Sequence, residues 1–284
     1  MRDQGYSRTA RKVAINLLSL AQRPGWRERL GAELVDAVRD LLRLSGVASE
    51  RMLRAAEHPF SLKVFDAIEP LAPAQLDSLG LRKIYFEERV RESLEAGAQQ
   101  QLVLGAGFDT LAFRLAKRYA DRRFFEIDHP ATAQRKRRGI EAMGRPSNLQ
   151  LLAADLGEVP LAIALEQAEG WDPNAPSVIC LEGLTMYLSR AENLALLRAL
   201  FALTGPGSRV VLTHVRIAED GQLGFGGFAG KLSRWSLKLM GEPWRWGTKD
   251  ADLPAFTTQA GWHVQTELST RGGVESFATL ARDS

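Results

Sequence analysis

Cysteine and histidine are scarce in this chain. A single cysteine, Cys180, stands among 284 residues, which excludes a disulfide framework and any zinc site built from cysteines alone. No two of the four histidines are close enough for the spacing of an HExxH motif or a zinc finger, since they stand at His58, His129, His214 and His263. The sequence therefore predicts no metal site.

Uncompensated charge and long apolar runs are also absent. The 37 basic residues are nearly balanced by 34 acidic ones, and the net charge of +3 is too small for a strong nucleic-acid-binding field. The basic run at residues 135–138 is typical of a solvated helix face, so we expect no nucleic-acid partner. Because no run of about 18 apolar residues occurs, we expect no transmembrane helix and no membrane partner.

The N-terminal segment imitates a signal peptide. Basic residues precede an apolar stretch at residues 13–21, but Asn16 and Ser19 interrupt this stretch and no clear cleavage site follows. We therefore expect a cytoplasmic protein with an amphipathic first helix.

The spacing of apolar residues changes at about residue 100. Before it, apolar residues three, four and seven positions apart predict helices over residues 26–44, 52–71 and 79–94. After it, short apolar runs alternate with helical segments, which predicts a doubly wound parallel α/β sheet. The predicted strands are residues 101–105, 123–128, 149–155, 177–183, 208–215, 262–268 and 275–282.

This pattern divides the chain into two parts. We expect an N-terminal helical cap over residues 1–98 and a core over residues 99–284, with a lid insertion at about 216–250. Residues 221–230 hold five glycines, and Trp235, Met240, Trp244 and Trp246 follow them, which suits a lid over a hydrophobic acceptor. A surface insertion is the alternative. The closing pair of strands is unusual for nicotinamide-binding folds and typical of class I methyltransferases.

A glycine turn follows the first predicted strand. Gly105 and Gly107 in LGAGFDT allow the backbone to turn sharply and to approach a ligand, and the next helix begins with free N–H groups. A dinucleotide fingerprint would place a third glycine at position 110, where Thr110 stands, so a pyrophosphate is disfavoured. A plain strand-to-helix turn is the simpler alternative.

Acidic residues end the next three strands, at the edge where doubly wound sheets bind ligands. Asp128, preferred over Glu126 of the same strand, can accept both hydroxyls of a ribose. Asp155 with Leu156 suits an adenine, and a glutamate, Glu182, points into the cleft. Tyr187 follows as a candidate catalytic residue, with core packing as the alternative.

Together these blocks resemble the leucine carboxyl methyltransferase family. The resemblance is carried by SRTA, LGAGFDTLAFRL, FFEIDHPATAQRKR, AADL, LEGLTMYL and AGW, in this order. The family includes the enzyme that methylates the C-terminal leucine of a protein phosphatase and bacterial small-molecule enzymes similar to the tetracenomycin carboxyl methyltransferase. The resemblance implies a class I fold, in which the last strand of a seven-stranded Rossmann-like sheet is antiparallel, and S-adenosylmethionine as cofactor, with S-adenosylhomocysteine as product.

The resemblance also implies roles for single residues. Arg82 would pair with the carboxylate of S-adenosylmethionine, and Gly105 with Gly107 would form the turn beneath its methionine part. Glu182 would lie near the amino group and the sulfonium, while Asp128 would bind the ribose and Asp155 with Leu156 the adenine. Two positions depart from the family pattern. Leu111 stands where members often carry arginine, which argues against a charge contact at the helix start, and His58-Pro59 replaces an Asp-Pro block, which indicates an altered cap and an unusual substrate.

The acceptor is the least defined part of the reaction. A carboxylate, with a pKa of about 4, is ionised at neutral pH and needs no general base, whereas a phenol, with a pKa of about 10, needs one. His214, at the end of the fifth strand, is the candidate base, and a histidine bonded to backbone is the alternative. We expect a small-molecule carboxylate acceptor from natural-product biosynthesis. The alternatives are a protein or peptide C-terminus, a phenol, a non-catalytic adenosylmethionine-binding protein and a nicotinamide dehydrogenase.

Overall fold

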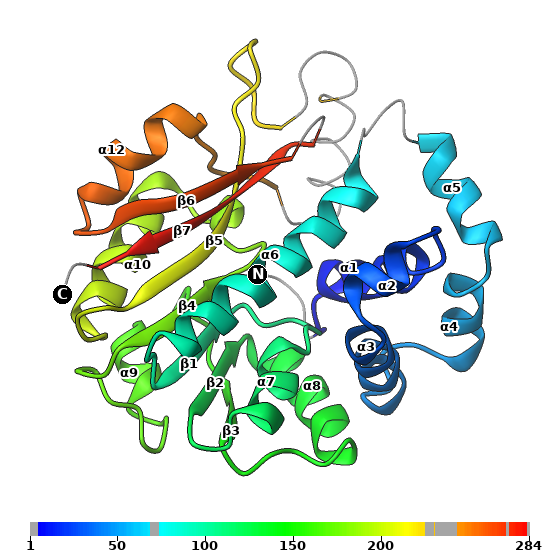
Figure 1. The fold of residues 1–284 in the computed structure, drawn as a ribbon, viewed down its shortest axis with the longest axis horizontal. Coiled ribbons are helices and arrows are strands. Elements are labelled where there is room, and N and C mark those ends of the chain that lie inside the picture. The colour runs from blue at the N-terminus through cyan, green and yellow to red at the C-terminus, as the bar shows by residue number, and fades with distance from the viewer. Residues whose placement is uncertain (1–4, 69–73, 225–229, 231–242, 271–272, 283–284) are drawn as a thin grey trace.

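A seven-stranded sheet with helices on both faces forms the centre of the computed structural model (Figure 1). The structure describes residues 5–68, 74–224, 230, 243–270 and 273–282. The strand order is β3-β2-β1-β4-β5-β7-β6, and β7 is antiparallel to both of its neighbours while β1–β5 are parallel. This topology confirms the predicted class I methyltransferase fold.

Each predicted strand is present, with ends displaced by two residues at most. The strands are β1 (Gln100–Leu104), β2 (Arg123–Asp128), β3 (Leu149–Ala153), β4 (Ser177–Leu181), β5 (Arg209–Val215), β6 (His263–Ser269) and β7 (Glu275–Ala281). The predictions for β3 and β4 extended too far, because Asp155 and Glu182 lie beyond the last hydrogen-bonded pairs of these strands.

Alternate residues of the parallel strands are buried on opposite faces, as their continuous apolar runs require. Leu102 and Leu104 of β1 belong to a cluster with residues of α9 (Leu161–Leu165), α10 (Arg190–Ala202) and α12 (Leu253–Thr258). Val103 belongs to the cluster on the other face, which contains residues of α6 (Gln75–Glu95), α7 (Leu111–Arg118) and α8 (Pro130–Ala142). The part of the core that the structure describes also contains the 3₁₀ turns η1 (Thr185–Tyr187) and η2 (Asp250–Asp252).

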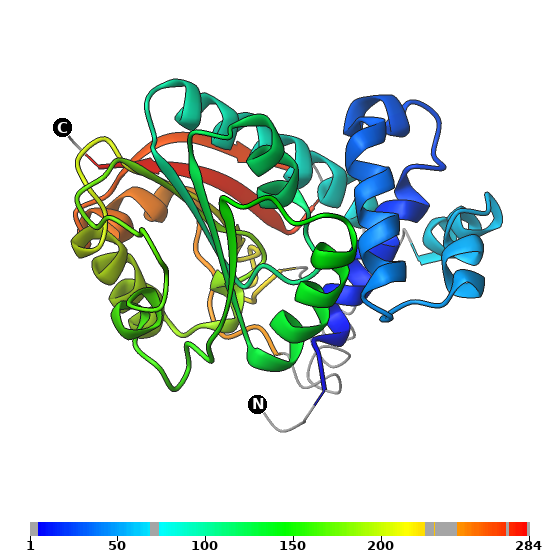
Figure 2. The same ribbon diagram turned by 90° about the horizontal axis from the view of Figure 1, so that it is seen from below.

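Five helices form a cap at one end of the sheet (Figure 2). They are α1 (Arg8–Leu20), α2 (Trp26–Leu30), α3 (Ala32–Leu44), α4 (Glu50–Ala56) and α5 (Phe60–Ile68). The single helix expected over residues 26–44 is wrong, because Gly31 adopts φ +80° and ends α2 before α3 begins. The helix expected over 52–71 is likewise divided, at His58 and Pro59.

The cap shares its apolar core with the sheet. Leu17 of α1, Val38 of α3 and Phe86 of α6 belong to the same buried cluster as Phe113 of α7 and Phe124 of β2. α6, which the sequence assigned to the cap, lies against β4, β5 and β7. The cap is therefore held in place at the carboxyl edge of the sheet by continuous apolar packing.

Two further expectations concern the predicted lid and membrane-spanning helices. Residues 225–229 and 231–242 of the predicted lid, which include Trp235 and Met240, lie outside the described residues. Among the helices that are described, none combines the length and the apolar character needed to cross a membrane.

Candidate active site

The glycine turn after β1 brings the cap into contact with the sheet edge. Gly105 and Gly107 adopt φ values of +67° and +48°, in the left-handed region that favours glycine. A Cβ atom on Gly107 would lie 3.0 Å from the Cβ of Ala10 on α1, and one on Gly105 would lie 3.3 Å from Cδ1 of Leu184. The absence of side chains therefore allows α1 and the loop after β4 to close over the turn.

Asp128 is fixed beside this turn by backbone donors. Its Oδ2 accepts a hydrogen bond from the Gly107 N–H at 2.5 Å and its Oδ1 accepts one from the His129 N–H at 2.7 Å. Burial raises the pKa of Asp128, although the hydrogen bond from Gly107 opposes this effect. The carboxylate at the end of β2 is thus held at the rim of the cavity, as its proposed ribose-binding role requires.

Glu126, the other acid of β2, supports the glycine turn indirectly through Lys136. Glu126 is buried, and its Oε2 lies 2.7 Å from Nζ of Lys136, which also donates to the Ala106 carbonyl at 3.3 Å. Burial raises the pKa of Glu126. The interpretation of residues 135–138 as a solvated face is therefore wrong for Lys136, which is the buried partner of this acid.

Asp155 and Leu156 follow β3 at the same edge. Oδ1 of Asp155 accepts a hydrogen bond from the Gly157 N–H at 3.0 Å, and its Oδ2 lies 3.7 Å from Nε2 of His129. Both Asp155 and Leu156 line the cavity next to Asp128. A carboxylate beside an apolar side chain at this position can accept from an amine while the leucine packs against a flat ring.

A cluster of five charged side chains lies at the carboxyl edge of the sheet, on the side away from Asp155. Nε of Arg82 donates to Oε1 of Glu182 at 3.0 Å, and Nη1 of Arg82 lies 2.9 Å from Oε2 of Glu275. Nζ of Lys83 lies 2.7 Å from the same Glu182 oxygen and also pairs with Asp109. Two cations and three carboxylates give this cluster a formal charge of −1.

Ion pairing keeps Arg82 and Asp109 charged despite their burial. Burial opposes the charge on Arg82, but Glu275 and Glu182 outweigh it and raise the pKa of the guanidinium. Burial would likewise raise the pKa of Asp109, but Lys83 outweighs it and holds that pKa well below its usual range. Among the described residues, no hydrogen bond engages Nη2 of Arg82, which leaves one donor group available to a ligand.

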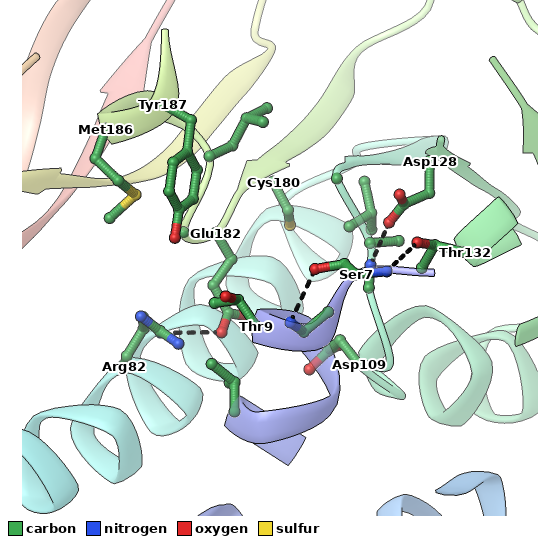
Figure 3. A pocket seen from close by; sticks show the side chains of 18 of the residues that line it. Ser7, Thr9, Arg82, Asp109, Asp128, Thr132, Cys180, Glu182, Met186 and Tyr187 are labelled. Carbon is green, nitrogen blue, oxygen red and sulfur yellow. Dashed lines mark hydrogen bonds and ion pairs between the residues drawn. The ribbon is translucent and has the colours of Figure 1, made fainter. Parts of the chain in front are cut away.

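These residues surround one cavity of about 1020 Å³. The structure brings all seven predicted cofactor-binding residues to its wall, namely Arg82, Gly105, Gly107, Asp128, Asp155, Leu156 and Glu182. Tyr187 of η1 lines it as well, and Figure 3 shows its hydroxyl directed towards Glu182.

His214 is not part of this cavity. Its side chain is fully buried on β5, and its Nε2 lies 3.1 Å from Oε1 of Glu267 on β6. A group in this position has no access to an acceptor in the cavity, which corrects the prediction of His214 as a general base. Together with Asp250, His214 and Glu267 place ligand atoms within 4.8 Å of one another, so the absence of a metal site stays a prediction.

Sequence reasoning missed three members of the charged cluster. Asp109 lies inside the LGAGFDT block, and its position in the glycine turn was the available signal. Lys83 follows Arg82 directly, but adjacent helical residues normally diverge. Glu275 reaches the site because β7 pairs with β5, where it stands opposite Val215. No local sequence pattern predicts this pairing.

S-adenosylmethionine, the cofactor implied by the sequence resemblance, fits this arrangement. Its sulfonium, amino and carboxylate groups carry a net charge of +1, opposite to the charge of the Arg82 cluster. The turn at Gly107 offers a backbone surface without side chains, and Asp128 lies between it and the adenine-like site at Asp155. The order of these sites follows the order of methionine, ribose and adenine in the cofactor.

Comparison with known protein families matches residues 9–201 to leucine carboxyl methyltransferase. A "Putative S-adenosyl-L-methionine-dependent methyltransferase" from Mycobacteroides abscessus is 30% identical over 242 residues, which are 80% of this chain and 76% of that protein. A protein of the same name from Saccharopolyspora erythraea is 30% identical over 224 residues, covering 77% of this chain and 75% of the relative.

Solved structures agree in fold. A "putative methyltransferase" from Thermobifida fusca YX has a TM-score of 0.61 at 17% identity and covers 87% of this chain and 94% of its own. A "putative O-methyltransferase" from Nostoc punctiforme PCC 73102 has a TM-score of 0.50 at 14% identity, with 68% and 54% covered. With its matching sequence blocks and sheet topology, the chain belongs to the leucine carboxyl methyltransferase family and is an S-adenosylmethionine-dependent methyltransferase of class I fold.

Proposed function

We propose that this protein transfers a methyl group to a carboxylate of a small molecule, such as an intermediate of natural-product biosynthesis. The observation that carries the proposal is that the three carboxylates of the charged cluster are all ion-paired, so none of them is a free general base. Glu182 and Glu275 are both paired with Arg82, and Asp109 is paired with Lys83. A carboxylate acceptor needs no base, whereas a phenol does.

The histidine that does line the cavity serves another purpose. Nδ1 of His129 accepts a hydrogen bond from the Ala131 N–H at the start of α8, and its Nε2 faces Asp155. This places His129 at the adenine end, remote from the Arg82 cluster along the edge. It therefore offers no base at the position where the acceptor would react.

When bound, S-adenosylmethionine would supply an electrophilic methyl carbon: as a carboxylate oxygen forms its bond to this carbon, the bond from the carbon to sulfur would break and S-adenosylhomocysteine would leave, with no proton transfer. Arg82, through Nη2, holds the cofactor's carboxylate, and Glu182 attracts its positive charge. Asp128 binds the ribose, while Asp155 and Leu156 fix the adenine. α1, which contacts the glycine turn, would help to exclude water from the reacting oxygen, and loss of this water makes a carboxylate a better nucleophile.

A small molecule is favoured over a protein tail by the shape of the site. The cavity of about 1020 Å³ must hold both cofactor and acceptor, and drug-sized ligands fill pockets of about 300–1,000 Å³. The cap covers the approach along α1 and α6, so a free molecule has easier access than a chain terminus attached to a folded protein. A peptide C-terminus is the second candidate, because the family description names a leucine carboxyl group.

The proposal predicts base-labile methyl esters. The purified protein should be incubated with S-adenosylmethionine and a panel of carboxylic acids, each paired with a phenol of similar skeleton, and the products followed by mass spectrometry. We expect methylated products that hydrolyse in mild base. Methylation confined to the phenols, giving base-stable ethers, would overturn the proposal.

A matched pair of variants ties this activity to the described site. Asp128→Asn should lower methyl transfer and the affinity for S-adenosylhomocysteine by about tenfold or more, because a charge-assisted hydrogen bond is lost. Asp121→Asn removes an exposed acid that lies outside the cavity wall and should change neither.

A further inference from the structure

The cavity extends beyond the charged cluster into the cap. On α6, Leu76 and Leu79 precede Arg82 at intervals of three residues, and all three side chains line the cavity. On α1, Val13 and Leu17 are four residues apart and line it from the opposite side. Six residues of helix span about 9 Å, so this wall runs well away from the cofactor-binding residues.

Apolar side chains from four helices form this part of the wall, which we call the cap lobe. It comprises Val13, Leu17, Val38, Phe65, Leu76 and Leu79. Asn16 and Gln75 give it a polar border. Leu17, Val38, Leu76 and Leu79 are at most 7% exposed and form the base of the cap lobe. Val13 and Phe65 are half-buried, so these two side chains supply the apolar surface that remains available for contact with a ligand.

The cofactor does not account for the cap lobe. The groups of S-adenosylmethionine are matched by the glycine turn and the charged residues of the sheet edge, and its polar ends gain nothing from an aliphatic wall. Burial of apolar surface stabilises a complex in proportion to the area removed from water. The second ligand of a methyltransferase is its acceptor, and the cap lobe adjoins the charged cluster where the methyl group would be transferred.

We propose that the cap lobe binds the hydrocarbon body of the acceptor. The acceptor is then a carboxylic acid with an extended apolar part, whose carboxylate lies beside the methyl group to be transferred and whose body lies against the cap lobe at Val13 and Phe65. This inference rests on the proposed function for the reacting end, while the cap lobe itself is defined by its apolar wall.

Binding to protein saturated with S-adenosylhomocysteine tests the cap lobe without turnover. Calorimetric titrations with decanoate and with butanoate, both below their micellar concentrations, compare a long and a short acid with the same head group. We expect decanoate to bind at least about tenfold more tightly, because its additional methylenes are buried against the cap lobe. Equal affinities for the two acids would overturn the inference.

Variants of the wall sharpen the test. Val13→Trp fills the cap lobe and should weaken decanoate binding at least about fivefold, with butanoate and S-adenosylhomocysteine affinities unchanged. Phe65→Ala removes part of the wall, should also weaken decanoate binding, and decides the question if Val13→Trp does not fold. Ile163→Trp, at an exposed position of α9 outside the cavity wall, is the control and should bind decanoate as the wild type does.

The outcomes separate this inference from the proposed function. If both wall variants retain full decanoate affinity, or if they lose S-adenosylhomocysteine to the same extent, the cap lobe is not the acceptor site. If decanoate binds selectively but no carboxylic acid yields a methyl ester, the cap lobe stands and the proposed function fails. If esters form only from short polar acids, the proposed function stands and this inference fails.

Discussion

At the scale of single residues, the pair of Asp109 and Lys83 joins the glycine turn to α6. Oδ1 of Asp109 accepts a hydrogen bond from the Leu111 N–H at 2.7 Å, while its Oδ2 pairs with Nζ of Lys83. Both side chains are at most 15% exposed, so water screens the pair only weakly. Removing one partner of such a buried pair leaves the other charge poorly compensated.

Asp109→Asn should therefore destabilise the fold by about 3 kcal/mol at pH 7, since Glu182 still compensates part of the Lys83 charge. The folded state lowers the pKa of Asp109, so its stabilisation is present above the pH at which an unfolded aspartate titrates, about pH 4, and is lost as the pH falls further. Urea unfolding of wild type and variant should thus give a difference that is constant from pH 8 to 5 and shrinks below pH 4. A difference independent of pH would contradict this assignment, and Asp121→Asn is the exposed control.

The strand-end acids were predictable from the sequence, but the residues that complete the site were not. Asp128 ends β2, Asp155 and Glu182 come after β3 and β4, and the carboxyl ends of such parallel strands share one edge. The same reasoning failed for His214, because a position at the end of a strand places a residue at the edge of the sheet but does not decide to which face of the sheet its side chain points. Thr213 accepts from the Gly183 N–H at 2.8 Å, and the next residue of β5 points to the opposite side, where Glu267 lies.

At the scale of elements, the contact between α1 and the glycine turn shapes the cavity. Ser7 caps α1 by accepting a hydrogen bond from the Ala10 N–H at 3.0 Å, and its own N–H donates to Oγ1 of Thr132 on α8 at 3.0 Å. The start of α1 is therefore held against the sheet edge from two sides, with Gly107 directly beneath Ala10.

Gly107→Ala should disturb this contact as well as the turn. An alanine in the left-handed region costs about 1–2 kcal/mol in any setting. Gly144→Ala is the matched control, because Gly144 has φ +79° and nothing within 4 Å of an added Cβ. We expect Gly107→Ala to lose at least as much stability in urea unfolding as Gly144→Ala, because only its Cβ also meets Ala10, and we expect only Gly107→Ala to lose S-adenosylhomocysteine affinity, by about tenfold or more. Equal affinities in the two variants would show that the contact of α1 with the turn is unimportant.

The boundaries of the cap helices were harder to predict from the sequence than the ends of the strands. Apolar residues continue in helical register from Leu30 to Leu34 although Gly31 between them ends one helix and precedes the next. The spacing of apolar residues indicates which face of a helix is buried. Because the apolar spacing continues unchanged from α2 into α3, it does not indicate the break at Gly31. The strands, in contrast, end where polar residues interrupt short apolar runs, and their predicted ends were displaced by two residues at most.

At the scale of the whole molecule, α6 makes the cap and the sheet one structural unit. The hydroxyl of Tyr85 lies 3.0 Å from Oγ1 of Thr266 on β6 and 2.9 Å from Oγ1 of Thr279 on β7. Its neighbour Phe86 is 1% exposed and belongs to the apolar cluster that also contains Leu17 of α1. Residues assigned by sequence to the cap are thus bound to the last two strands of the core.

This shared core predicts cooperative unfolding. Urea titrations followed by far-ultraviolet circular dichroism, which reports helices throughout the chain, and by tryptophan fluorescence should give one coincident transition, because Trp26 is buried in the cap and Trp262 in the core. Phe86→Ala should lower the free energy of unfolding by about 3–5 kcal/mol and keep the two midpoints equal, since the cavity it creates weakens both parts together. Midpoints that separate in the variant would mean that the cap unfolds on its own. In that case the proposed acceptor site at the cap lobe would open before the sheet edge unfolds.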